Sequence, residues 1–460
     1  MKKFLVALFV VLLVAAGYLG GIYYYSDKFV ANTHFGQVDV SGLTVAQAVE
    51  KIERETNARE LTVNEDGASL ATVKLGDLET HYDLEPSVTA AFNAQDPVGW
   101  AMNFVQGSRF DGVTSKMAKA NAEKLATILA GQGIDNALRI APVDAKLAYD
   151  DAKGYHVING EIGTQIDFTA LSEQLLNQAG ESQSTIDLAQ SYARPTISED
   201  SDVVTTVMAN IHQVANKKVI LNIAGEDVEI PSKLIESWIH FDNDNKLVLD
   251  ESLVESYLTE LNDKYSTFNK ERKFQSTLQG EVTVPPGILG WEIDIEKELP
   301  QLLADLYGNK QEIKREPAIY STGGVPNAKD DIGRKYIEVD ISNQMMYLYI
   351  DGEPMLSSNV VTGQPGAPTI PGANAVIEML TDTKLRGYNP FYKKEYAVDV
   401  SYWIRFDHNA QGIHDASWQP QFGGDTYTWS GSLGCVNTPY ENVAYLYEQI
   451  EYGTPVIVFE

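Results

Sequence analysis

The residues best suited to chemistry in this 460-residue chain are its single cysteine, Cys435, and His414, which lies 21 positions upstream. A thiolate attacks carbonyl carbons, and an imidazole can take the thiol proton and return it to a leaving amine. Gly434 lets the backbone come close to a substrate carbonyl, and the amides around it could stabilise an oxyanion. The pair predicts cysteine acyl transfer; the alternative is that Cys435 is a small buried apolar residue.

Another histidine, His408, lies among Asp, Asn and Gln residues, a composition typical of a turn. We expect it on the surface rather than in catalysis. Zinc sites need closely spaced ligand pairs, and two histidines with one cysteine do not supply them here. Neither a metal nor a cofactor is therefore expected.

An uncharged apolar stretch covers residues 4–25, which is long enough to cross a bilayer. Lys2 and Lys3 precede it and favour a short cytoplasmic tail at 1–3, with the rest of the chain outside the cytoplasm. A cleaved signal peptide is the alternative, because small residues at 14–17 could form a cleavage site. Either interpretation places Cys435 outside the cytoplasm as a free thiol.

Composition limits the other possibilities. The net charge is −29, which argues against a nucleic-acid partner because phosphates require a basic surface. Hydrophobic residues make up 44% of the chain, enough for packed cores, and the length suggests about three domains.

The middle of the chain contains a weak internal repeat. Residues 160–167 read GEIGTQID and residues 287–294 read GILGWEID, and a helical pattern follows each, at 171–178 and 299–307. We predict two α+β modules, at 57–200 and 201–320. A stalk and small folded piece at 26–56 precede them, with a helix whose capping box joins Thr44 and Gln47.

Residues 321–334 begin STGGVPN and are interpreted as a linker to a last domain at 335–460. This domain opens with two β-rich runs, 336–341 and 345–350, which predict a hairpin. Further strands are expected at 358–362, 375–380 and 397–406. A helix after Pro439 and a buried strand at 455–459 close the chain, so Cys435 is predicted to lie just before a helix.

Residues 335–460 resemble the L,D-transpeptidase catalytic domain of the YkuD family. The motifs that carry the resemblance are GIHDASW at 412–418, FGGD at 422–425 and GSLGCVN at 431–437. Supporting matches are VTG at 361–363, TIPG at 369–372 and SYW at 401–403. The middle modules are similar to peptidoglycan-binding domains that precede this catalytic domain. The implied fold is multi-domain α+β, ending in a β-rich, mixed-sheet, sandwich-like catalytic domain.

The resemblance implies that Cys435 is the nucleophile and His414 the general base and acid. The backbone carbonyl of Ser432 would orient the imidazole. Gly434 would help to stabilise the oxyanion and would let the backbone come close to the substrate. Trp418, Tyr402 and Asn437 are expected to contact substrate.

The implied reaction is cell-wall L,D-transpeptidation in peptidoglycan biosynthesis. Cys435 would attack the third residue of a donor tetrapeptide stem and release D-Ala, and an acceptor stem would resolve the thioester into a 3→3 cross-link. A carbapenem could acylate the same sulfur. The expected location is the outer side of the cell membrane, in a Gram-positive organism.

One departure from the family pattern leaves alternatives open. Leu433 stands where the family usually has a histidine, so a catalytically impaired, peptidoglycan-binding homologue is one alternative. A sortase-like cysteine transpeptidase is another, but it needs an Arg after the cysteine, and residues 436–460 contain no Arg or Lys. Papain-like peptidases place Cys before His, the reverse of the order here.

Overall fold

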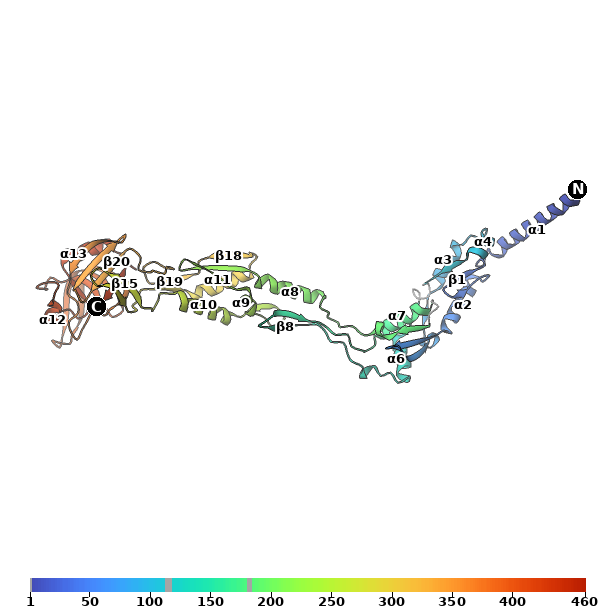
Figure 1. Ribbon diagram of the computed structural model, residues 1–460, viewed down its shortest axis with the longest axis horizontal. Coiled ribbons are helices and arrows are strands. Elements are labelled where there is room, and N and C mark those ends of the chain that lie inside the picture. The colour runs from blue at the N-terminus through green and yellow to red at the C-terminus, as the bar shows by residue number, and fades with distance from the viewer. Residues whose placement is uncertain (1, 112–117, 180–183) are drawn as a thin grey trace. The chain divides into compact units, whose positions relative to one another are not determined.

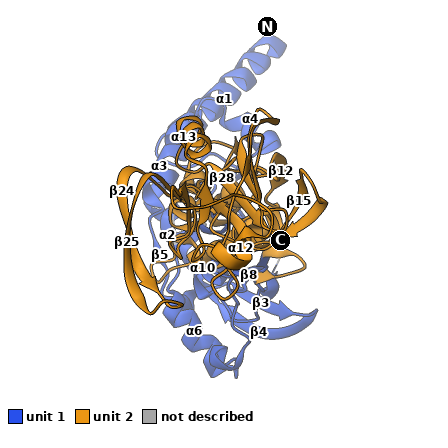
Figure 2. Cartoon of the chain, turned by 90° about the vertical axis from the view of Figure 1, so that its left-hand side faces the viewer, with its two compact units in different colours: residues 1–148, 156–206 blue, residues 149–155, 207–460 orange. Residues whose placement is uncertain are grey.

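A computed structural model describes residues 2–111, 118–179 and 184–460 (Figure 1). The chain divides into two compact units, residues 1–148 with 156–206 and residues 149–155 with 207–460 (Figure 2). The units contain both helices and sheets, and the second ends in a β-rich domain, so the prediction of a multi-domain α+β protein is confirmed.

The first described helix, α1 (Lys2–Tyr24), is long and apolar enough to cross a membrane, and its side chains are mostly exposed. A signal sequence would satisfy the same criteria. The other helices described in the first unit are α2 (Val45–Asn57), α3 (Glu85–Ala94), α4 (Trp100–Gln106), α6 (Ala122–Gly131) and α7 (Phe168–Ala179).

Residues 26–56, expected to form a stalk leading into a small folded piece, share a folded core with the segment that follows them. β1 (Thr33–Phe35) pairs with β2 (Val38–Asp39) and, in parallel, with β6 (Ser108–Phe110). Phe29, Phe35 and Ile52 pack with Leu84 and Val88 of the following segment in one core. The prediction stopped at residue 56 because the partners of this apolar surface lie some 30 to 60 residues further along the chain. The capping box of α2 is confirmed, with Thr44 and Gln47 bonding reciprocally.

The two modules share one topology, which explains the sequence repeat. In the first, β3 (Glu60–Glu65) pairs antiparallel with β4 (Ala68–Lys74) and parallel with β10 (Thr185–Asp187), which follows α7. In the second, β11 (Lys218–Ile223) pairs antiparallel with β12 (Glu226–Glu229) and parallel with β18 (Glu312–Arg315), which follows α11 (Ile295–Tyr307).

The repeated residues perform repeated local tasks. Asp167 accepts the Thr169 amide at the start of α7, and Asp294 accepts the Lys297 amide at the start of α11. Such N-cap carboxylates satisfy amides that have no partner inside the helix. Gly290 lies where a Cβ atom would collide with the backbone of Phe268.

The remaining described elements of the modules are two longer helices, α8 (Asp202–Ala215) and α10 (Glu251–Tyr265), and several short helices and strands. The short elements are β5 (His81–Tyr82), β7 (Ala118–Lys119), β8 (Lys146–Asp150), β9 (Gly154–Ile158), α9 (Ser232–Ser237), β13 (Ile239–Phe241), β14 (Leu247–Leu249), β15 (Arg272–Ser276), β16 (Gly280–Val284), β17 (Trp291–Ile293) and β19 (Ile319–Ser321), with single 3-10 turns at Leu75–Leu78, Asn136–Leu138 and Leu188–Ser191.

The C-terminal domain is built from two mixed sheets. The five-stranded sheet has the order β22 (Glu353–Asn359), β21 (Met345–Ile350), β20 (Tyr336–Asp340), β28 (Pro455–Phe459), β23 (Gly372–Ala375). The four-stranded sheet has the order β24 (Glu378–Asn389), β25 (Lys394–Arg405), β26 (Gly412–Asp415), β27 (Val436–Thr438). Residues of both sheets and of α13 (Tyr440–Gln449) share one buried core, which includes Val339, Ile413, Val436 and Leu446.

Most elements predicted for this domain are confirmed, including the 336–350 hairpin, the closing helix and the buried last strand. The expected strand at 358–362 overlaps only the end of β22, and Val361 makes an isolated bridge to Asn437 instead. Cys435 does not directly precede a helix. It precedes β27, because 436–438 pairs with β26 before α13 begins.

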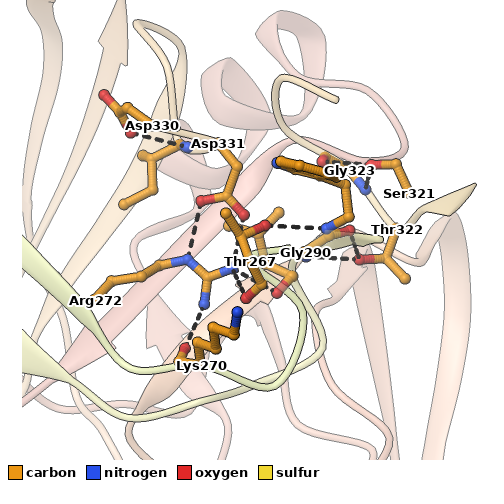
Figure 3. Close-up of polar contacts among 12 residues, drawn as sticks. Thr267, Lys270, Arg272, Gly290, Ser321, Thr322, Gly323, Asp330 and Asp331 are labelled. Carbon is orange, nitrogen blue, oxygen red and sulfur yellow. Dashed lines mark hydrogen bonds and ion pairs between the residues drawn. The ribbon is translucent and has the colours of Figure 1, made fainter. Parts of the chain in front are cut away.

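The segment 321–334 is a packed connection rather than a free linker. Asp331 forms a bidentate ion pair with Arg272, at 2.9 and 2.6 Å, and both side chains are buried (Figure 3). Arg272 also donates to the carbonyls of Thr267 and Leu289. The β15–β16 hairpin packs through Phe274 against the last strand of the C-terminal domain. A fragment of 335–460 would expose the apolar surface that this hairpin covers.

We predict that Asp331→Asn lowers the free energy of unfolding of the second unit by about 3–5 kcal/mol, because Arg272 would keep a buried, unpaired charge. Urea unfolding followed by tryptophan fluorescence would measure the change. Asp330→Asn is the matched control, because Asp330 is exposed, and it should shift stability by less than about 0.5 kcal/mol. Equal effects of the two substitutions would contradict this account of the junction.

Candidate active site

The pairing of β26 with β27 brings the strand that carries His414 beside the strand that Cys435 directly precedes. The strands are parallel, with Ile413 opposite Val436 and His414 opposite Asn437. Ile413 and Val436 point into the domain core. Because side chains alternate along a strand, His414 and Asn437 point to the opposite face, and Cys435 directly precedes β27. Cys435 is half-buried there and His414 is buried.

Burial keeps both groups neutral at rest. It raises the pKa of the Cys435 thiol to about 11, although a backbone hydrogen bond from Gly412 partly offsets this rise. Burial also lowers the pKa of His414, and its contact with Asp415 offsets only part of that shift. A neutral thiol beside a neutral imidazole requires proton transfer during attack, which is the role of a general base.

His414 is oriented by its sequence neighbour. Its Nδ1 lies 2.8 Å from the carbonyl oxygen of Asp415. A carbonyl only accepts, so Nδ1 carries the proton and Nε2 is left as the basic nitrogen. We expected the Ser432 carbonyl in this position. That carbonyl instead accepts the amide of Gln364, because 363–364 lies beside the 432 segment.

Aromatic residues flank the imidazole. The rings of Trp403 and Trp418 lie 6.0 and 5.8 Å from the His414 ring, and Trp418 is half-exposed. Tyr402 was also expected there, but the structure contradicts this placement. Its ring contacts Tyr440 and Tyr447 around α13, since neighbouring residues on β25 face opposite ways.

The turn before the nucleophile is held by side-chain hydrogen bonds. Ser432 Oγ donates to the Cys435 carbonyl at 2.5 Å and accepts the Gly434 amide at 3.0 Å. Thr369 Oγ1 donates to the Gly434 carbonyl at 2.9 Å. The Gly434 amide is therefore engaged with Ser432 in this conformation, whereas we expected it to face an oxyanion.

Gly434 is required for close packing and for its backbone conformation. Its φ is +116°, and a Cβ atom would come within 2.5 Å of Gln411 Nε2. Gln411 is itself fixed, because it accepts the Ile370 amide and donates to the Pro368 carbonyl. We expected the Gly434 backbone to come close to a substrate carbonyl, and this close approach requires a residue without a side chain.

We predict that Gly434→Ala slows acylation about tenfold, equivalent to about 1.4 kcal/mol, by displacing the turn that carries Cys435. Acylation by a carbapenem, followed by intact mass, would measure the rate. Gly424→Ala is the control, because Gly424 also has a positive φ, +60°, but a Cβ there would meet no atom within 4 Å. Equal losses in both variants would show that backbone strain, not contact with Gln411, is responsible.

Asn437 has a positioning role in the structure. Its Nδ2 donates to Gln419 Oε1 at 2.9 Å, and Gln419 Nε2 donates to the Ser430 carbonyl at 3.0 Å. The residue is buried, so it ties the 416–431 loop to β27. Asn437 had been expected to contact substrate.

His408, expected on the surface, is exposed, and its backbone carbonyl accepts a hydrogen bond from Arg405.

Tyr396 was missed by the sequence analysis. Burial raises the pKa of its hydroxyl, and the electrostatic influence of Cys435 raises it further. It extends over Gly387 on the paired strand β24, where a Cβ would lie 2.6 Å from its oxygen. Its segment, KKEYAV, carries no catalytic signal, and only the β24–β25 pairing brings it to the site.

Among the described residues, no group of three or more His, Cys, Asp or Glu side chains is arranged to hold a metal ion. The chemistry available at this site is that of a thiol, an imidazole and a phenol in a largely enclosed, aromatic surrounding. This combination suits acyl transfer at a carbonyl carbon.

Comparisons with known proteins agree with this chemistry. Residues 334–458 match the family model YkuD, described as "L,D-transpeptidase catalytic domain". Residues 71–187 and 201–314, half of the chain, match the model described as "Putative peptidoglycan binding domain". A search of curated proteins found no significant match.

Several solved structures are similar. An Enterococcus faecium L,D-transpeptidase with a cysteine-to-serine substitution is 38% identical, over 55% of this chain and 99% of that one, with a TM-score of 0.48. The Ldtfm–avibactam carbamoyl enzyme is 37% identical, over 56% and 99%, with a TM-score of 0.49. The catalytic domain of E. faecium L,D-transpeptidase acylated by ertapenem is 42% identical, over 27% and 97%, with a TM-score of 0.26. The chain thus belongs to the L,D-transpeptidase family, with a YkuD catalytic domain preceded by peptidoglycan-binding domains.

Proposed function

We propose that this protein forms 3→3 cross-links in peptidoglycan through a thioester on Cys435. The observation that supports the proposal is the parallel register of β26 and β27, in which His414 lies opposite Asn437, two residues after Cys435, while Nδ1 of His414 bonds to the Asp415 carbonyl. The match to a transpeptidase catalytic domain supports the same reaction class.

The first half-reaction is acylation. His414 Nε2 removes the thiol proton while Sγ bonds to the carbonyl carbon of the third stem residue. The C–N bond to the terminal D-Ala then breaks, and the imidazolium gives its proton to the departing amine. Because the pKa of the resting thiol is about 11, thiolate formation and attack are coupled through His414.

The second half-reaction transfers the acyl group. An amine from a neighbouring stem attacks the thioester carbon and loses a proton to His414. The C–S bond breaks, and the sulfur recovers that proton as the new amide leaves. Half-exposed Trp418 would form one wall of the donor cleft, because it stands beside His414 at the surface.

Tyr396 would stabilise the transition state of both steps, by donating its hydroxyl hydrogen to the sulfur or to the carbonyl oxygen as charge develops. We predict that Tyr396→Phe lowers the acylation rate about tenfold and leaves the fold intact. Tyr392→Phe, at the exposed tip of the same hairpin, should have no effect. Stopped-flow fluorescence with a carbapenem would measure both rates, and an unchanged rate in Tyr396→Phe would remove the phenol from the mechanism.

The other parts of the chain would bring the catalytic domain to its substrate. Both repeat modules match the peptidoglycan-binding model, and α1 would anchor the chain in the cell membrane with the catalytic domain on the wall side. A signal peptide at the same position would also deliver the protein to the wall.

Analysis of muropeptides made by the full-length protein from disaccharide-tetrapeptides tests the proposal. We expect a dimer linked between two third residues, together with one equivalent of D-Ala. The alternative, a binding homologue impaired by Leu433, predicts bound muropeptide with no D-Ala released. D-Ala released without a dimer would instead indicate hydrolysis of the thioester.

A further inference from the structure

An uncharged surface lies beside the candidate membrane helix. Residues 97–106 read PVGWAMNFVQ and contain no ionisable group, in a chain with 99 charged side chains. Four large apolar residues of this segment are exposed, Val98 by 53%, Met102 by 59%, Phe104 by 58% and Val105 by 84%. Exposing this much apolar surface in one short segment is costly in water and marks an interaction surface.

The segment is fixed to the last two turns of α1. Tyr18 Oη donates to the Val98 carbonyl at 2.6 Å, and Trp100 Nε1 donates to the Tyr18 carbonyl at 3.2 Å. The indole of Trp100 packs over Gly21, where a Cβ atom would collide with it. Tyr25 also contacts this indole, with the ring centroids 5.7 Å apart. α4 is therefore placed beside the end of the apolar helix (Figure 1).

The position along α1 corresponds to the edge of a bilayer. From Tyr18 to the end of the helix at Tyr24 the rise is about 9 Å, at about 1.5 Å per residue. An amphipathic helix at an interface buries its apolar face about 5–10 Å below the headgroups. Trp100, Tyr18 and Tyr25 also have the amphipathic rings that concentrate at this level.

We propose that residues 97–106 form a second membrane contact, with α4 lying in the outer interface beside α1 and its apolar side chains among the lipid acyl chains. The occupant is the lipid bilayer itself, since the surface is continuous with a helix that needs the same apolar environment. The inference rests on the proposed role of α1 as an anchor.

The contact would hold the first folded core against the membrane. Asn103 Nδ2 donates to the Ala31 carbonyl at 2.5 Å, and Ser108 Oγ donates to Asn103 Oδ1 at 3.0 Å. Gln95 accepts the Val30 amide and donates to the Lys28 carbonyl. Residues before and within α4 are thereby bonded to residues 28–31, the chain that leaves α1. With both α1 and α4 in the membrane, this core would have two attachments, which would restrict its rotation about the anchor.

The single cysteine permits a direct test in the full-length chain. With Cys435→Ser as background, a nitroxide is attached through Val105→Cys and the protein is placed in phosphatidylcholine nanodiscs. Collision with oxygen and with a water-soluble nickel chelate gives the depth of the label. We expect a depth of about 5–10 Å below the phosphates. Adding Phe104→Glu should shift the label toward water.

Two further labels separate the possible failures. Ser69→Cys, at the exposed start of β4 in the same unit, should read as aqueous, and Val11→Cys should read near the bilayer centre. An aqueous reading at 105 with a deep reading at 11 would overturn the surface contact and leave the anchor in place. Aqueous readings at both positions would overturn the anchor and the contact together.

Discussion

No covalent adduct is expected when the Cys435→Ala protein is incubated with a carbapenem, and no 3→3 dimer when it is given disaccharide-tetrapeptides. The chain contains no other thiol, so no second residue can form a thioester. Removal of a nucleophile that forms a covalent intermediate commonly eliminates nearly all of the rate enhancement. Intact-protein mass spectrometry would record the adduct as a mass increase of one inhibitor in the wild type alone.

The fold should survive this substitution. Cys435 is half-buried, directly precedes β27 and is not a member of the core cluster that contains Val436. Thermal unfolding of Cys435→Ala should therefore resemble that of the wild type, which separates loss of chemistry from loss of structure. Dimer formation at the wild-type rate by this variant would end the assignment of the nucleophile. Absence of an adduct in the wild type as well would favour the binding homologue.

The second large effect is expected at His414. His414→Gln keeps a polar side chain of similar reach but has no basic nitrogen, so acylation should slow by at least about 10²-fold. His408→Ala is the matched control, because His408 is exposed. Leu433 removes the histidine that the resemblance places beside the sulfur, so we expect no substitute base. Near-normal acylation by His414→Gln, or a large loss of acylation in His408→Ala, would show that His414 is not the general base.

The pH profile provides an independent check. Only neutral His414 can accept the thiol proton, and burial lowers the pKa of this imidazole. The base is therefore present above the lowered pKa and is lost as the pH falls through it, so the acid limb should lie below the ordinary histidine range near 6.5. Carbapenem acylation rates measured from pH 4.5 to 9 would show this limb in the wild type and in His408→Ala. A limb above pH 7 would contradict the assignment.

The sequence by itself predicted the chemical pair and determined most elements around it. One thiol and a histidine at a fixed spacing limit the nucleophile and base to very few choices. β-rich runs predicted the 336–350 hairpin, and a continuous apolar run predicted the last strand, all of whose residues are buried. The two Gly-and-Asp motifs predicted a duplicated module because each performs a local task, helix capping by Asp167 and Asp294.

Only the tertiary structure decided which partners those residues have. The imidazole bonds to the Asp415 carbonyl rather than that of Ser432, because pairing with 363–364 occupies the latter. The β24–β25 pairing sets the position of Tyr396 opposite Gly387, and residues 26–56 share a core with partners from residue 82 onward. These contacts join segments far apart in the chain, and no local pattern of residue types encodes which backbone groups and side chains will meet across such distances.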